Sequence, residues 1–535
     1  MEASKKLAQE NGNQASALLG ELTGDELLAQ NGNQAGSALG ELTGDELLAQ
    51  NGNQAGVGVA EHFDELAGGP KCLTFTANEN GSSVGFCCWS DYLEPVDTGK
   101  NMQYSRDGGE TWQDYTIGVG EENLVAIELN EGESVMFRGI NENLAYYIES
   151  EDDYINIKCF IEGSVAASGD VTSLLNGVGG DVPLAQYCYS YMFEGCVGLT
   201  QAPALPSTIL ADSCYINMFS GCTGLTQAPV LPATTLGAYC YSFMFFECTS
   251  LTQAPVLPAT TLASNCYDDM FFGCTGLTQA PALPATTLVE YCYYRMFKDC
   301  AGLTLAPALP AITLADSCYR DMFDGCTGLT QAPELPATTL ADACYEGMFF
   351  GCTGLTQAPA LPVTTLADSC YGGMFNGCTG LTQAPVLPAI TLTTGCYAGM
   401  FANCTGLTQA PALPATTLAD SCYINMFSGC TGLTQAPALP ANILANGCYT
   451  NMFRGCTNIM LYDVVTLNNS ENTFQNNSSC ASLTIHADTP PTITYNTITG
   501  LKADCIIYVP AASVDAYKAA QYWSARASYI QAIQE

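Results

Sequence analysis

Cysteine is the residue type with the most chemical potential in this chain, because 28 thiols occur among its 535 residues. Most fall into two regular series. The first recurs every 26 residues from Cys188 to Cys448, and the second follows eight residues later, from Cys196 to Cys456. Thiols in such numbers form disulfides, bind metal ions or act as small buried apolar groups.

The spacing of the thiols favours the third role. Cys188 and Cys196 are expected about two helical turns apart, roughly 12 Å along a helix axis. A disulfide requires Cα atoms within about 7 Å, and the spacing fits no common zinc pattern. Disulfides between neighbouring units and metal binding remain open as weaker alternatives. We therefore expect two ladders of buried free thiols.

Other groups that could do chemistry are sparse. The chain has two histidines, His62 and His486, which lie in different segments. No nucleophile–base arrangement and no glycine-rich phosphate loop is found. The carboxylate pair Asp268–Asp269 occupies positions that vary between units, so a solvated face is expected there. We predict no catalytic residue, no cofactor and no bound metal.

One short motif has a known enzymatic association. Residues Ser105–Trp112 read SRDGGETW and resemble the Asp-box of sialidases. That motif braces a hairpin and carries no catalytic group. A sialidase needs several copies and an arginine cluster, whereas this segment has one copy and only Arg106 and Arg138. Enzyme activity is therefore not expected.

The elements that position the thiols are repeats of 26 residues. In the first unit Cys188, Met192, Phe193 and Cys196 are spaced for one face of a short helix. The next stretch, which starts at Leu199, resembles the strand of a leucine-rich repeat, and proline-rich segments supply the turns. We predict an α/β solenoid of parallel short strands and short helices over residues 188–473.

These units resemble the leucine-rich repeats of BspA-like bacterial surface proteins. The resemblance covers roughly residues 188–460, where Phe, Cys, Leu and Pro recur in register. The unit is longer than the family's usual one, and Met replaces Ala. The resemblance implies extracellular adhesion or recognition and implies no catalytic residue.

Comparison of the units suggests two surfaces for partners. The predicted strand carries a nearly unbroken row of glutamines about 4.8 Å apart, which could match a glycan or another repeat or could simply be a solvated face. The predicted helical back varies and holds aromatic and arginine residues, which interfaces favour, although drift on an unconstrained surface would give the same variation. The glutamines are Gln201, Gln227, Gln253, Gln279, Gln331, Gln357, Gln383, Gln409 and Gln435, and the candidate contacts of the back are Tyr191, Phe243, Phe246, Phe272, Tyr294, Arg295, Arg320 and Phe350.

The segments on either side of the 26-residue repeats have different sequence patterns. Residues 1–66 hold 20-residue repeats such as ELTGDELLAQNGNQAGSALG, which resemble N-terminal modules of phage fibre and head-decoration proteins; a flexible spacer is the alternative. Residues 67–166 alternate polar and apolar positions and predict an antiparallel β-sandwich-like domain. Residues 167–187, with Val171–Asn176 as a helix, and residues 474–535 are expected to cap the two ends of the solenoid.

Charge and resemblance together limit the classes of partner that are expected. The formal charge of −38 argues against nucleic acid. No apolar run is long enough for a membrane helix, and the start lacks the apolar core of a secretion signal. We expect a virion surface protein that contacts other virion proteins through residues 1–66 and a host-surface glycan or protein through the solenoid. The resemblance to phage fibres implies a homo-oligomer, a trimer. The alternative is an adhesin at the bacterial cell surface or outer membrane.

Overall fold

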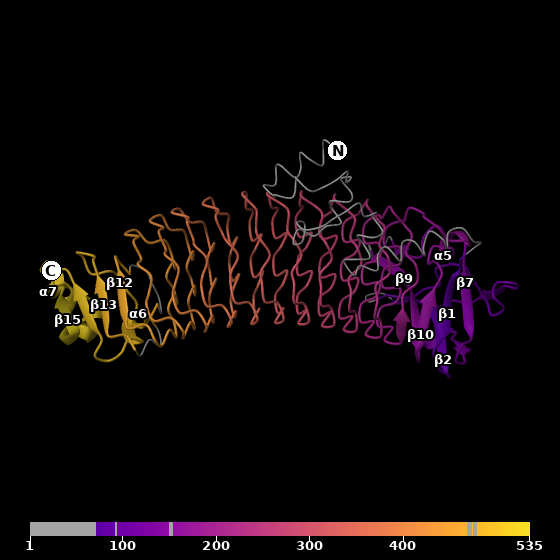
Figure 1. Ribbon diagram of the computed structural model, residues 1–535, viewed down its shortest axis with the longest axis horizontal. Helices are drawn as coiled ribbons and strands as arrows, with labels where there is room; N and C mark the ends of the chain where they lie inside the picture. Colours follow the sequence, from indigo (N-terminus) through magenta and orange to yellow (C-terminus); the bar gives the residue numbers. More distant parts are fainter. Residues whose placement is uncertain (1–70, 91–93, 149–152, 468–472, 475–478, 535) are drawn as a thin grey trace, which may run out of the picture.

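The computed structural model describes residues 71–90, 94–148, 153–467, 473–474 and 479–534. Over these residues the chain is an elongated, gently curved body, with a strand-rich region at each end and stacked repeats between them (Figure 1). The 20-residue repeats predicted in residues 1–66 lie outside the described residues. The domain boundaries given above stay predictions.

Two sheets pack face to face at the N-terminal end of the described chain. Their shared core contains Phe75, Phe86, Tyr115 and Phe137, with the rings of Phe86 and Phe137 5.0 Å apart. The first sheet has the order β11-β10-β1-β7-β3-β4 and the second the order β5-β2-β9-β8, with β6 also paired to β2. Most pairs are antiparallel, as the alternating sequence predicts. The strands are β1 (Leu73–Ala77), β2 (Ser82–Trp89), β3 (Met102–Ser105), β4 (Gln113–Tyr115), β5 (Gly118–Val119), β6 (Ile127–Leu129), β7 (Ser134–Arg138), β8 (Tyr146–Ile148), β9 (Asp153–Glu162), β10 (Val165–Ser168) and β11 (Leu199–Gln201), and a 3-10 helix, η2, covers Glu121–Asn123.

The first sheet continues into the repeats without a break. Strand β10 pairs in parallel with β11, which belongs to the first 26-residue unit. The ring of Phe75 lies 6.2 Å from Phe193 of that unit. The predicted helix near Val171 is present as α5 (Ser173–Asn176), and it buries Leu174. The N-terminal sheets therefore close one end of the solenoid core.

The interior of the repeats consists of ladders of identical side chains. Tyrosine rings from Tyr189 to Tyr449 stack at centroid spacings of 5.7 to 6.1 Å. Phenylalanine rings from Phe193 to Phe453 stack at 5.4 to 5.8 Å. The cysteines, methionines and first leucines of the units are buried beside them. Each unit thus buries its apolar side chains only against its neighbours.

The burial of the thiols is confirmed: all 28 cysteines are buried. Ten thiols of the second series, from Cys222 to Cys456, donate hydrogen bonds to the phenylalanine carbonyl of the preceding unit at 2.9 to 3.0 Å. A small apolar group with a weak donor therefore suits this position.

The short helix predicted in each unit is wrong. Where the first unit passes into the second, Ser213, Tyr215 and Asn217 have positive φ, which no α-helix tolerates in series. The N–H groups of Met218 and Ser220 close tight turns within the unit, whereas alternate N–H groups donate to the next unit, as Phe219 does to Met244 at 2.9 Å. The backbone is thus satisfied by the neighbouring unit and not by a helical ladder.

The strand predicted in each unit is, beyond the first unit, shortened to isolated β-bridges. Beyond β11, the described residues of the 26-residue units contain isolated parallel bridges, such as Gln227 with Gln253 and Gln357 with Gln383. The Ala-Pro-x-Leu-Pro stretch explains this, because proline has no N–H to donate to a ladder. The units therefore form a leucine-rich-repeat-like solenoid with little regular secondary structure.

The C-terminal end returns to regular strands. A four-stranded parallel sheet has the order β12-β13-β14-β15, and Leu439 bridges Val464 of its first strand. Trp523 and Tyr517 are fully buried, and the Trp523 Nε1–H donates to Pro491 O at 3.0 Å. The elements are β12 (Leu461–Val464), β13 (Ser482–Ile485), α6 (Tyr495–Thr499), β14 (Ile506–Val509), η3 (Ala511–Ser513), α7 (Val514–Ala519), η4 (Trp523–Tyr529) and β15 (Ile530–Ala532).

Candidate recognition surfaces

The predicted glutamine row lies on the outside of the solenoid. All nine glutamines of the row, from Gln201 to Gln435, are exposed. Parallel bridges join Gln227 to Gln253 and Gln357 to Gln383, so these residues occupy matching places in adjacent units. Leu305 interrupts the row, is 49% exposed, and bridges Gln279. The solenoid therefore presents primary amides at a regular interval.

Threonines and valines lie beside the glutamines. From here on, the glutamine row means the nine glutamines together with these neighbours. The hydroxyl of Thr252 contacts the carbonyl of Thr226 at 3.4 Å, and that of Thr304 contacts Thr278 at 3.3 Å. Three residues after a glutamine, Val386 is 78% exposed. An amide both donates and accepts hydrogen bonds. The row therefore combines neutral polar groups with small apolar groups.

The aromatic candidates on the variable segment are less exposed than expected. Phe246 and Phe272 are half-buried, because their rings stack on each other at 4.8 Å. Phe243 lies 5.9 Å from Phe246 and is also half-buried. Phe350 fits the prediction, with 42% exposure.

Tyr191 has a role within the molecule. Its ring lies 5.8 Å from Trp89 of β2, and the ammonium of Lys158 lies 4.1 Å from the same indole. Lys158 also pairs with Glu194 at 2.9 Å. Tyr191 therefore helps to join the N-terminal sheets to the first unit.

The arginine candidates are paired with acids of the same unit or of the next one. Arg295 lies over the ring of Tyr294 at 4.6 Å and reaches Asp321 at 3.8 Å. Arg320 reaches Asp321 at 3.7 Å and Glu346 at 3.4 Å. These half-exposed pairs contribute little to stability individually. They do partly neutralise the two guanidinium groups.

The carboxylate pair Asp268–Asp269 was predicted to be solvated, and this is wrong. Asp268 is 8% and Asp269 is 3% exposed. Burial, followed by the charge of Asp268, raises the pKa of Asp269 to about 8. Burial also raises the pKa of Asp268. At neutral pH the pair therefore carries fewer than two negative charges.

The sialidase-like motif braces a hairpin, as predicted. Between β3 and β4 the Ser105 hydroxyl donates to Asp107 Oδ1 at 2.6 Å, and Asp107 Oδ1 accepts the Thr111 N–H at 2.9 Å. These hydrogen bonds lower the pKa of Asp107 well below its usual range. The Trp112 indole N–H donates to Gly109 O, and Arg138 lies 4.0 Å over the indole ring. Every polar group of the motif named here is thus used inside the turn.

Reactive chemistry is not assembled elsewhere in the described part of the chain. Within it, no group of three His, Cys, Asp or Glu residues could hold a metal ion. Burial raises the pKa of the ladder thiols, for example that of Cys248 to about 12, which keeps them protonated. A search of the same residues finds no helix that is long and apolar enough to cross a membrane.

Comparisons with known proteins show a likeness in structure. No protein-family model matches the chain, and no curated protein matches it. Among solved structures, a leucine-rich repeat protein from Bacteroides ovatus is similar over 83% of this chain and 100% of its own, with 16% identity and a TM-score of 0.39. A likeness of this degree says nothing further about what this chain binds.

Proposed function

We propose that this chain is a non-enzymatic recognition protein whose solenoid binds an extended, repeating partner along the glutamine row. The observation that carries the proposal is the exposure of all nine glutamines at one place in successive units. A partner with regularly spaced hydroxyl groups could use several amides at once, so that weak single contacts add up.

Charge, hydrogen-bonding capacity and apolar groups together favour a neutral glycan as the partner. The formal charge of −38 disfavours anionic polymers. Hydroxyl groups of a neutral sugar chain match the amides, which donate and accept. Its apolar ring faces match the exposed valines Val230, Val256 and Val386.

A triple variant tests the glutamine row. Gln227→Ala, Gln253→Ala and Gln279→Ala together should weaken binding to an immobilised neutral polysaccharide about a hundredfold, at roughly 1 kcal/mol for each lost contact. A panel of neutral polysaccharides, read by surface plasmon resonance, supplies the probes. The matched control is Asn376→Ala, Ser428→Ala and Arg454→Ala on the variable segment. Equal loss in both triple variants, or binding that neither variant changes, would rule out the row as the binding surface.

For the setting of this recognition we propose the surface of a virus particle. The support is the resemblance of residues 1–66 to phage fibre and head-decoration modules, which would anchor a homo-oligomer to other virion proteins. The second candidate is a bacterial surface adhesin, which the BspA-like sequence of the units favours. Mass spectrometry of purified particles and of outer membranes from the same source separates the two. Detection in membranes alone would exclude the virion setting.

A further inference from the structure

Two thiols of the C-terminal sheet face each other. Cys480 Sγ and Cys505 Sγ are 2.8 Å apart, and both side chains are fully buried. Non-bonded carbon atoms sit about 3.5 to 4.0 Å apart, and sulfur is the larger atom. The two sulfurs are therefore closer than ordinary packing brings them.

The backbone holds this arrangement in place. Cys480 comes just before β13, and Cys505 directly precedes β14. These strands are parallel neighbours, with Ser482 opposite Ile506, and the Ile506 N–H donates to Ala481 O at 3.0 Å. This register sets Cys505 opposite Ala481, the residue after Cys480. With adjacent strands about 4.8 Å apart and a rise of about 3.3 Å per residue, the diagonal between the two cysteines is about 6 Å, within the Cα separation that a disulfide spans. A covalent bond between the sulfurs needs no rearrangement of the sheet.

The thiols of the repeat ladder are oriented differently. Cys430 donates to Phe401 O at 2.9 Å, and the equivalent thiols donate in the same way to the unit before. Cys480 and Cys505 also contact backbone carbonyls, those of Ser482 at 3.5 Å and Ile506 at 3.8 Å, but in addition their sulfurs contact each other. The C-terminal pair is therefore set apart from the ladder by its contact.

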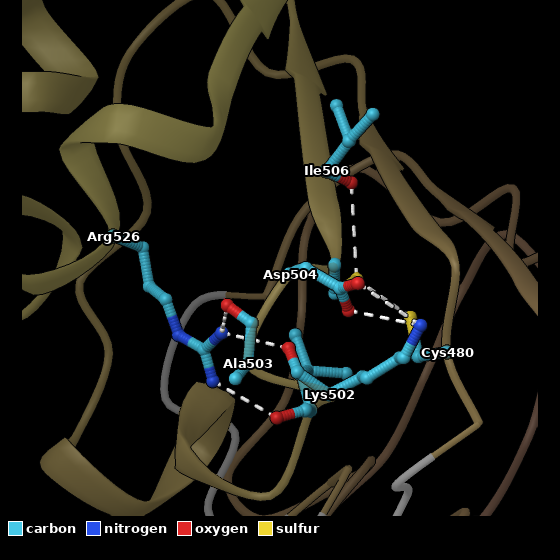
Figure 2. Close-up of polar contacts among 8 residues, drawn as sticks. Cys480, Lys502, Ala503, Asp504, Ile506 and Arg526 are labelled. Atoms are coloured by element: carbon cyan, nitrogen blue, oxygen red, sulfur yellow. Dashed lines mark hydrogen bonds and ion pairs between the residues drawn. The ribbon is translucent and has the colours of Figure 1, made fainter.

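Arg526 is hydrogen-bonded to the backbone of residues 501–503, the loop that precedes Cys505. Its guanidinium donates to the carbonyls of Leu501, Lys502 and Ala503 at 2.9, 2.8 and 3.0 Å. Figure 2 shows Arg526 reaching the carbonyls of Lys502 and Ala503 from one side of the loop, with Cys480 on the other. The hydrogen bond with Cys480 lowers the pKa of Cys505 most; burial opposes it, and the positive charge of Arg526 adds to the lowering, so that the net direction is down. A lowered pKa enriches the thiolate, which is the nucleophile in disulfide exchange.

We propose that Cys480 and Cys505 are a disulfide-forming pair that joins β13 to β14 when the protein meets a small-molecule disulfide such as oxidised glutathione. Both thiols are buried, so the exchange proceeds from a locally opened C-terminal end of the sheet. There the Cys505 thiolate attacks one sulfur of the glutathione disulfide, forms a mixed disulfide and expels one glutathione thiolate. Cys480 then loses its proton to solvent, attacks the Cys505 sulfur and expels the second glutathione thiolate. Two protein thiols are oxidised, and one small disulfide is reduced to two thiols.

Tryptic mapping tests the proposal on the full chain. The folded protein is incubated with oxidised glutathione, denatured, alkylated and digested. Cleavage after Arg454, Lys502 and Lys518 places Cys480 in peptide 455–502 and Cys505 in peptide 503–518. The expected result is one disulfide-linked pair of these peptides, with Cys456 and the other ladder thiols alkylated, so that 26 of the 28 cysteines carry the label.

Variants distinguish this pair from general oxidation of thiols. Cys480→Ser should abolish the linked peptides and leave glutathione attached to Cys505, whereas Cys430→Ser should leave the link intact. The oxidised protein should also melt at a higher temperature than the reduced protein, and Cys480→Ser should remove that difference. Full alkylation of all 28 cysteines after oxidation, or links spread among the ladder thiols, would overturn the proposal.

Discussion

The tyrosine ladder contains hydroxyl groups in two different situations. The Tyr189 hydroxyl donates to Val171 O at 2.9 Å, where the ladder meets the N-terminal sheets. The hydroxyl of Tyr319 is buried in the middle of the ladder and has no hydrogen-bond partner among the described residues. A buried polar group without a partner costs about 1 to 3 kcal/mol.

Replacing the two hydroxyls should therefore have opposite effects. Tyr319→Phe should raise the free energy of unfolding by about 1 kcal/mol, because it removes an unsatisfied group and keeps the stacked ring. Tyr189→Phe should lower it by about 1 kcal/mol, because it loses a hydrogen bond. Denaturant titration of both variants measures the difference. A similar loss in both would show that the Tyr319 hydroxyl is satisfied in solution.

Residue identity predicts burial well where the side chain is apolar and less well where it is charged. Cysteine, methionine and phenylalanine recur at fixed places, and their burial follows from sequence alone. Asp268 and Asp269 occupy places that vary between units, where polar residues such as Asn217 alternate with apolar ones such as Phe243. Such variation predicts exposure. Burial there depends on the units on either side, which carry large side chains such as Phe243 and Tyr294. One unit read alone does not contain that information.

At the scale of the element, the positive-φ positions explain why the predicted helix is absent. Gly221, Gly273 and Gly325 have φ near 70° at one repeated place in the unit. The spacing of Cys, Met and Phe fits a helical face, but spacing alone does not show where the N–H groups donate. Here alternate groups donate to the next unit, and only the stacked structure shows this. The glutamine row follows from sequence alone, because its prediction requires only that one polar residue recur at the same position of each unit.

The same place in the third unit holds Glu247, with φ of 54°. A side chain in the left-handed region costs about 1 to 2 kcal/mol. Glu247→Gly should therefore raise the free energy of unfolding by about 1 kcal/mol, measured by thermal melting. The control is Glu334→Gly, an exposed residue without positive φ, which should lose about 0.5 to 1 kcal/mol from added chain entropy. Equal effects of the two substitutions would contradict the conformational argument.

At the scale of the whole molecule, stability depends on contacts between neighbours. Tyr319 stacks on Tyr293 and Tyr345, and its unit shares hydrogen bonds with the units before and after it. The N-terminal sheets and the C-terminal sheet cover the two ends of the core (Figure 1). In such an array the free energy of unfolding is close to a sum of unit and interface contributions. The fold should therefore tolerate a change in the number of internal units, but not a change in the 26-residue length of the unit.

Removal of one complete unit tests this view. Deletion of Cys344–Ser369 joins Ala343 to Cys370 and leaves every ladder in register, with Tyr319 now next to Tyr371. The shortened chain should fold, melt within a few degrees of the parent, and lose about one ring spacing, 5.9 Å, from its longest dimension in solution scattering. The control deletes Cys344–Thr356, half a unit, which would set the glutamine row of one unit against the thiols of the next. That chain should lose its cooperative melting transition, because the Tyr, Phe and Cys ladders would be broken at the join. Equal stability of the two deletions would mean that the units are not held together by their ladders.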